Sequence, residues 1–126
     1  DDFADDPAFT RNWSLLHQLY IRGRHQMIST ITATQVYRAI SPVVRKNITD
    51  LCIFRLRNQS DLDAVIEETS AIFDKAALLK FYKAATVEPY SFLYVKLTAK
   101  TPDDMFCESF SKPINVTDAS SLCVSK

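Results

Sequence analysis

The single glycine, Gly23, is the feature of this 126-residue sequence that most restricts what it can fold into and bind. A chain of this length would carry about nine glycines at the usual frequency of about 7%. Loops that wrap a phosphate group need glycine, because their backbone N–H groups must turn inward and approach the ligand closely. Neither G-x-G-x-x-G nor G-x-x-x-x-G-K-[ST] occurs. The sequence as given therefore excludes a self-contained nucleotide-binding enzyme of either common kind.

The remaining composition is that of one globular domain, with 47% hydrophobic residues and 15 basic against 15 acidic side chains. The three cysteines, Cys52, Cys107 and Cys123, are odd in number and far apart. This favours reduced intracellular thiols over a disulfide framework or a zinc knuckle. No apolar stretch approaches the ~18 residues of a membrane span, and the acidic start does not resemble a signal peptide. The start without Met indicates a fragment or a processed piece.

A secreted glycoprotein is the alternative that the asparagines raise. All four of them fit the N-x-[ST] pattern of glycan acceptors: Asn12, Asn47, Asn58 and Asn115. Without a signal peptide or an even cysteine count, coincidence in a Ser/Thr-rich chain is the favoured interpretation.

Basic and acidic residues are strongly segregated along the chain. Every arginine lies in an arginine-rich block, residues 11–57, where Asp50 is the one acid. The first ten residues and residues 58–126 are richer in acids than in bases. Arginine suits planar, bidentate contact with phosphate or carboxylate, whereas lysine more often serves solubility. The block therefore indicates an anion-binding function, with a solvated basic face as the alternative.

Hydrophobic periodicity predicts alternating helices and strands. Helices are expected from Trp13 to near Gly23, over 60–73, where Ser60 and Asp63 would cap the start, and over 74–85. Strands are expected over 27–33, closing at 34–35, over 51–56, over 91–98 and over 105–110. Residues alternate along 92–97, which places Phe92, Tyr94 and Lys96 on one face of that strand and Leu93, Val95 and Leu97 on the other. A short connection holds Pro42, and 112–126 forms a polar tail. This alternation predicts an α/β layered domain with a mostly parallel sheet, in which the strand over 51–56 is covered on both faces.

Candidate chemistry begins with the adjacent carboxylates Asp1 and Asp2, which could hold a magnesium-bound water and polarise an attacking water. Paired acids at a terminus are otherwise usually solvated. Gln35, at the expected carboxyl end of a strand, could orient a water or sense a γ-phosphate. His17 and His25 have no partner at metal-ligand spacing, so they predict no metal cage.

Four motifs follow one another in a distinctive order. They are Asp1-Asp2, the segment from Gly23-Arg24-His25 to Gln35, the segment from Asn47 through Arg55 to Asp61, and Glu88-Pro89-Tyr90-Ser91-Phe92-Leu93. Over residues 1–97 they resemble the second half of the FtsK/HerA superfamily of P-loop ATPases. The closest resemblance within it is to the genome-packaging ATPases of poxviruses, other large DNA viruses and Polinton-type elements.

The resemblance implies the C-terminal part of a three-layer, RecA-like P-loop NTPase core over residues 1–100, with an extra strand and polar tail over 101–126. It implies ATP and Mg²⁺ as cofactors, with Asp1 supporting the magnesium through a water and Asp2 polarising the attacking water. Gln35 would sense the γ-phosphate. Arg24 is the best candidate for reaching a neighbouring subunit's nucleotide, and the charge of such an arginine offsets that developing on the phosphoryl group. Arg45 and Arg55 are further nucleotide-binding candidates.

The same resemblance implies partners and a place of action. The expected partners are double-stranded DNA, copies of the same protein in a ring, and capsid or portal-like vertex proteins, with no membrane span. The expected location is the viral assembly site in the host cytoplasm or nucleus, and the virion. The alternative function is a non-enzymatic nucleic-acid-binding or interaction module that uses the arginine-rich block.

Overall fold

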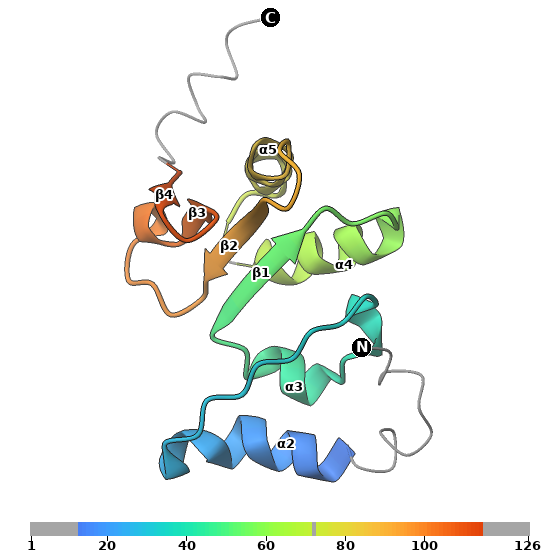
Figure 1. Cartoon of the computed structure of the whole chain (residues 1–126), viewed down its shortest axis with the longest axis vertical. Helices are drawn as coiled ribbons and strands as arrows, with labels where there is room; N and C mark the ends of the chain where they lie inside the picture. The colour runs from blue at the N-terminus through green and yellow to red at the C-terminus, as the bar shows by residue number, and fades with distance from the viewer. Residues whose placement is uncertain (1–12, 72, 115–126) are drawn as a thin grey trace, which may run out of the picture. The chain divides into compact units, whose positions relative to one another are not determined.

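The computed structural model describes residues 13–71 and 73–114 of the chain (Figure 1). The chain forms two compact units, the first ending at Ile48 and the second beginning at Thr49. Asp1, Asp2 and residues 115–126 of the predicted polar tail lie outside the described residues. The tail was predicted to begin at residue 112, which is wrong, because Lys112–Pro113 pair with the preceding strand.

The described residues of the first unit, 13–48, form a helix and three shorter helical segments. They are α2 (Trp13–Arg22), the 3-10 helices η2 (Gly23–Gln26) and η3 (Tyr37–Ala39), and α3 (Pro42–Lys46). The predicted helix ending near Gly23 is confirmed. α2 packs on α3, where His17 Nε2 lies 2.6 Å from Ser41 Oγ. Ser41 also caps α3, because its side chain accepts a hydrogen bond from the Val44 backbone N–H.

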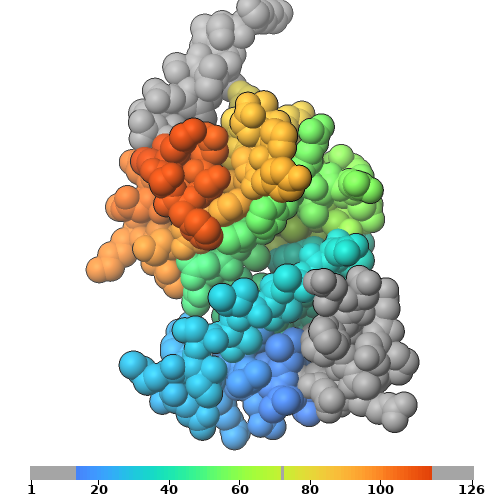
Figure 2. Space-filling view, viewed as in Figure 1, coloured from blue at the N-terminus to red at the C-terminus, as the bar shows by residue number. Residues whose placement is uncertain are grey.

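The strand predicted over 27–33 is wrong for this structure. Residues 29–34 form neither a helix nor a strand, Gln35 lies at a bend, and no backbone hydrogen bond joins the stretch to any described segment. Its β-branched side chains favour an extended backbone, whereas a strand also needs a neighbour that completes the hydrogen-bond ladder. Its atoms are visible on the surface in Figure 2, in light blue to cyan. Tyr20 ties the stretch to α2 by a 2.9 Å hydrogen bond from its hydroxyl to Thr32 Oγ1.

As far as residue 114, the second unit consists of a four-stranded sheet and two α-helices. The strands are β1 (Asp50–Phe54), β2 (Phe92–Lys96), β3 (Phe106–Glu108) and β4 (Lys112–Pro113), in the order β1-β2-β3-β4. Helices α4 (Gln59–Thr69) and α5 (Lys75–Ala85) connect β1 to β2, and η4 (Pro102–Asp104) precedes β3. The expected α/β class is confirmed, as are the helix ending at Ala85 and the strands over 91–98 and 105–110.

Every strand pairing in the described sheet is antiparallel, so the prediction of a mostly parallel sheet is wrong for these residues. Neighbouring parallel strands need a crossover that carries the chain back to the starting end of the first strand. Two successive helices, α4 and α5, instead return the chain to the end at which β1 stops. β2 therefore starts beside that end and runs in the opposite direction, as the two arrows in Figure 1 show.

Both helices of the second unit begin at a side-chain cap. Asn58, rather than the predicted Ser60, caps α4, because its Oδ1 accepts a 3.0 Å hydrogen bond from the Ser60 backbone N–H. Asp74 caps α5 through a 3.1 Å hydrogen bond from the Ala77 N–H to Oδ2. Polar side chains with an oxygen acceptor satisfy backbone donors that lack a partner in the first helical turn.

The core of the second unit lies between one face of the sheet and α5, which packs on β2 and β3. Phe106 is fully buried on β3, and its ring centre lies 5.3 Å from the ring centres of both Phe81 and Phe73. Leu93 and Val95 are buried on the same face, as the predicted alternation along β2 requires. β1 was expected to be covered on both faces, which is wrong: it is an edge strand, and Phe54 is 51% exposed.

Candidate functional site

Arg24 lies in η2, immediately after α2, and is exposed. The turn that follows it depends on Met27 rather than on Gly23. Met27 adopts the left-handed conformation, with φ of 57°, and the Ile28 N–H donates a 2.9 Å hydrogen bond to Gly23 O. Gly23 itself has no positive φ, and an added Cβ would meet Ile28 at an ordinary 3.5 Å. The glycine is therefore not required by the turn that presents Arg24.

Gln35 is exposed at a bend between residues 29–34 and η3. Next to it, Thr34 Oγ1 accepts a hydrogen bond from the Val36 N–H and donates one to the Val36 carbonyl, at 3.2 and 3.1 Å. Gln35 is thus not at the end of a paired strand, contrary to the expectation. Its role toward a γ-phosphate stays a prediction.

Arg45 is half-buried on α3, and its guanidinium carbon lies 5.4 Å from the centre of the Tyr37 ring. A guanidinium above a tyrosine ring is attracted by the negative ring face. This contact gives Arg45 a packing role within its own unit, beside the predicted nucleotide-binding role.

Arg55 follows β1 in the second unit and is exposed, as is Arg57. The residue between them, Leu56, is held by a 2.7 Å hydrogen bond from its N–H to the Tyr82 hydroxyl. Arg24, Gln35 and Arg45 thus belong to the first unit and Arg55 to the second. Among the described residues, no three His, Cys, Asp or Glu side chains come together as a metal site.

A hydrogen-bonded carboxylate on the sheet was not predicted from the sequence. Asp50 Oδ1 accepts a 2.6 Å hydrogen bond from the Tyr94 hydroxyl, and Oδ2 accepts one of 2.7 Å from Thr49 Oγ1. These two donors lower the pKa of Asp50, with a smaller contribution from the charge of Lys96. The bond to Asp50 raises the pKa of Tyr94 to about 12. Burial, together with the Asp50 charge, raises the pKa of Cys52.

An exposed aromatic face covers the side of the sheet that does not meet α5. The centre of the Phe92 ring lies 4.9 Å from the ring centres of both Phe54 and Phe110. The ring centres of Phe110 and Tyr94 are 5.3 Å apart. Phe54 and Phe110 are 51% and 71% exposed. The alternation along 92–97 predicted which residues share this face, but nothing in the sequence showed that it would be open.

The outer edge of β1 is also open within the described sheet. The Leu97 N–H donates a 2.9 Å hydrogen bond to Thr49 O, so the alternation of an antiparallel ladder turns the Leu51 and Ile53 backbone groups toward β2. The backbone N–H and C=O groups of Cys52 therefore point away from β2. An edge of this kind can accept a further strand.

The model of the family described as poxvirus A32 protein matches residues 1–112. The chain belongs to the poxvirus A32 protein family. This confirms the resemblance to a family of packaging ATPases. The A32 match includes Arg24, Gln35, Arg45 and Arg55, and it continues through β3. The predicted domain boundary at residue 100 stays a prediction.

One relative of this A32-family chain is the uncharacterized protein 075L of Invertebrate iridescent virus 6. The two are 27% identical over 101 residues, which cover 79% of this chain and 38% of the viral protein. The chain thus spans less than two-fifths of that relative. No solved structure matches the chain. Among the described residues, no helix is long and apolar enough to cross a membrane.

Proposed function

We propose that this chain is part of an ATP-driven motor that moves double-stranded DNA into viral or virus-like capsids. The observation that carries the proposal is the match of the poxvirus A32 family over residues 1–112. The relative from Invertebrate iridescent virus 6 supports a viral context. Such a motor would act at the site of virion assembly, as a ring of copies on a portal-like vertex.

Under this proposal, the described sheet is part of a larger RecA-like core. Three features of the structure support it. The stretch 29–35 is rich in strand-favouring residues but has no ladder partner, and β1 has an open edge. Each lacks a neighbour that a larger parallel sheet would supply. The exposed aromatic face, with Phe110 71% exposed, is a third surface that a larger domain would cover.

ATP and Mg²⁺ would be held mainly by residues other than those described. The single glycine leaves the given sequence without a phosphate-wrapping loop, and the described residues hold no cluster of metal ligands. The proposal assigns Asp1 to the magnesium-bound water and Asp2 to the attacking water. When bound, Mg-ATP would supply the phosphoryl group that water accepts.

The described residues contribute in two ways under this proposal. Gln35 is exposed and so accessible to a γ-phosphate, and Arg24 is exposed on a short helix at the end of α2. No ion pair holds Arg24 within the described part of the chain. An arginine of this kind can reach the nucleotide of an adjacent subunit, where its charge stabilises the transferring phosphoryl group. Arg45, packed on Tyr37, is the less accessible of the two arginines.

ATP hydrolysis by the longer protein that contains this sequence tests the proposal. Asp2→Asn and Gln35→Ala should each lower turnover by roughly 100-fold or more while nucleotide binding is retained. Matched controls are Asp103→Asn and Gln18→Ala, which change exposed residues away from the proposed roles. Wild-type turnover in either test variant would overturn the proposed chemistry.

A further inference from the structure

The Tyr82 hydroxyl holds the backbone on both sides of Arg55. It accepts a 2.7 Å hydrogen bond from the Leu56 N–H and donates a longer one, of 3.5 Å, to the Phe54 carbonyl oxygen. That carbonyl belongs to the peptide group before the Arg55 Cα, and the Leu56 N–H belongs to the peptide group after it. Because each peptide group is planar, the two hydrogen bonds restrict both backbone dihedral angles of Arg55.

The sheet does not supply this support. β2 begins at Phe92, which is paired with Phe54, so no described strand pairs with Arg55 or Leu56. Tyr82 reaches them from α5, which packs on β2 and β3. Its side chain is only 6% exposed, so the close-packed core holds its ring in place. The backbone at Arg55 is therefore fixed from the core of the second unit.

The side chain of Arg55, in contrast, is available to a ligand. It is exposed, and it forms no ion pair within the described parts of the chain. Residues 54–60 include no acid that would compete for it. A guanidinium can make bidentate hydrogen bonds to phosphate oxygens. A backbone that is already ordered lowers the entropy lost when such a long side chain binds.

We infer that Tyr82 is a positioning residue for phosphate binding by Arg55. The inference rests on the proposed function, under which Arg55 is a candidate for binding the nucleotide. Tyr82 itself touches no nucleotide, and its hydroxyl acts only on the backbone that carries Arg55. Loss of the hydroxyl should weaken ATP binding and leave the chemical step, assigned to Asp2, at its normal rate. The effect should therefore appear in KM rather than in kcat.

Steady-state ATP hydrolysis by the longer protein that contains this sequence measures the coupling between the two residues. The variants are Tyr82→Phe, Arg55→Gln and the double variant. Arg55→Gln should raise the KM for ATP by about tenfold and Tyr82→Phe by about threefold, each with kcat within about twofold of the wild type. The double variant should have the KM of Arg55→Gln alone, because the backbone position no longer matters once the guanidinium is gone.

Two control variants separate positioning from indirect effects. Thr69→Val removes another buried hydroxyl of the second unit, which donates a 2.7 Å hydrogen bond to the Val65 carbonyl. Arg57→Gln removes one positive charge from an exposed position two residues beyond Arg55. Both should keep the wild-type KM. A rise for Thr69→Val equal to that for Tyr82→Phe would indicate general loosening of the fold and would overturn the inference.

Three other kinetic results would also overturn it. They are a wild-type KM for Tyr82→Phe, a further rise in KM when Tyr82→Phe is added to Arg55→Gln, and equal rises for Arg57→Gln and Arg55→Gln. The last would show that net charge, rather than the held arginine, governs ATP binding.

Amide hydrogen exchange of the 126-residue chain tests the backbone contact without nucleotide. Tyr82→Phe should speed exchange at Leu56 at least about tenfold relative to Ile53, whose backbone groups point toward β2. An unchanged ratio would overturn the inference. A longer protein that hydrolyses no ATP would overturn the proposed function and this inference with it. Normal hydrolysis without coupling between Tyr82 and Arg55 would overturn the inference alone.

Discussion

The Tyr94 hydroxyl donates a 2.6 Å hydrogen bond to Asp50 Oδ1 across the β1–β2 ladder. The two residues are diagonal neighbours on one face, since Asp50 is paired in register with Lys96 and Tyr94 with Cys52. Diagonal contacts are within reach of long aromatic side chains in antiparallel sheets. The bond therefore links the first residue of β1 to the middle of β2.

The hydrogen bond between Tyr94 and Asp50 should make the free energy of unfolding depend on pH. The pKa of Asp50 in the folded protein is below its ordinary 3.8. The ionised carboxylate therefore stabilises the fold above pH 3.8, and this stabilisation is lost as pH falls through the folded-state pKa. The pKa of Tyr94 is raised from 10.0 to about 12, so the contribution of its protonated hydroxyl is present below pH 10 and is lost as pH rises toward 12. Tyr94→Phe should lower the free energy of unfolding by about 1 kcal/mol near neutral pH, a modest value for an exposed pair.

Urea denaturation of both proteins over a pH series measures this difference. The difference should shrink below pH 3.8 and above pH 10. Tyr90→Phe is the control, because Tyr90 is 95% exposed and the loss of its hydroxyl should not change the free energy of unfolding. A difference that stays constant well below pH 3.8 would show that the Asp50 carboxylate is not the partner.

The structure and the sequence-based prediction name different residues as the cap of α4, Asn58 and Ser60 respectively. Asn58→Ala should lower the free energy of unfolding by about 1 kcal/mol, because the Ser60 N–H loses its 3.0 Å acceptor. Ser60→Ala should change it by less than about 0.5 kcal/mol, since an exposed surface change carries little energy. Urea midpoints of the two variants decide between the caps. A larger loss for Ser60→Ala would favour the cap that the sequence suggested.

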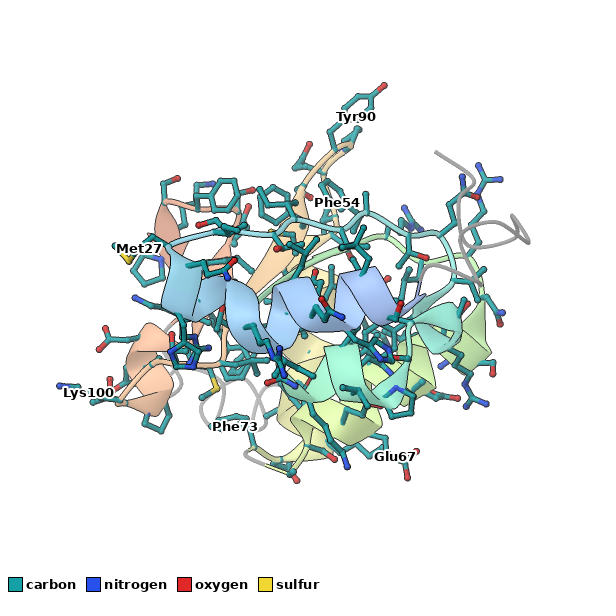
Figure 3. All side chains as sticks on the ribbon, turned by 90° about the horizontal axis from the view of Figure 1, so that it is seen from below. Met27, Phe54, Glu67, Phe73, Tyr90 and Lys100 are labelled. Carbon is teal, nitrogen blue, oxygen red and sulfur yellow. The ribbon has the colours of Figure 1, made fainter. Side chains whose placement is uncertain are left out.

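The turn between α5 and β2 holds Tyr90 in an unfavourable backbone conformation. The Ser91 N–H donates a 3.3 Å hydrogen bond to Glu88 O, and Tyr90 has φ of 63°. Pro89 followed by a residue with positive φ is the pattern of a type II turn, which favours glycine at that position. Figure 3 shows the Tyr90 side chain projecting away from the ribbon, so its removal loses no packing.

Tyr90→Gly should therefore raise the free energy of unfolding by about 0.5–1 kcal/mol. Tyr90→Ala keeps a Cβ and should give no such gain. Denaturation midpoints of the three proteins provide the comparison. Equal stability of the alanine and glycine variants would contradict the strain at this position.

The open edge of β1 and the exposed aromatic face should make the chain associate as its concentration rises. Phe54→Lys places a charge on both surfaces, because Phe54 ends β1 and lies 4.9 Å from the Phe92 ring. Light scattering over a concentration series should show weaker association for this variant. Val87→Lys, at a 67% exposed position outside the sheet, adds the same charge and should not weaken it. Equal effects of the two would mean that charge alone governs solubility.

Local features of the fold were predictable from particular residues. The helical spacing from Trp13 to Gly23, the run 74–85 and the alternation over 92–97 each predicted an element that the structure contains. These signals are local, because backbone preference and side-chain periodicity act over a few neighbouring residues. The relationship to the A32 family was likewise predictable from the sequence, because it rested on short motifs that follow one another in a fixed order along the chain.

Strand pairing could not be predicted in the same way. The β-branched residues of 27–33 favoured a strand, yet the described chain supplies no neighbouring strand for them. β1 was mistaken for a strand of a parallel sheet, because its apolar run does not state which strand lies beside it. The Tyr94–Asp50 bond escaped prediction for the same reason, since the two residues meet only through the register of β1 and β2.

The sequence by itself determined the lone glycine and the absence of a phosphate-wrapping loop, the segregation of the arginines and the membership of the A32 family. Only the tertiary structure decided that β1 and β2 are antiparallel, that Met27 rather than Gly23 makes the turn after Arg24, and that the arginine-rich block is divided between two units. The physical reason is the separation along the chain of the residues that interact. Composition and local preference are properties of adjacent residues, whereas strand direction, register and shared surfaces depend on contacts between residues far apart in the chain.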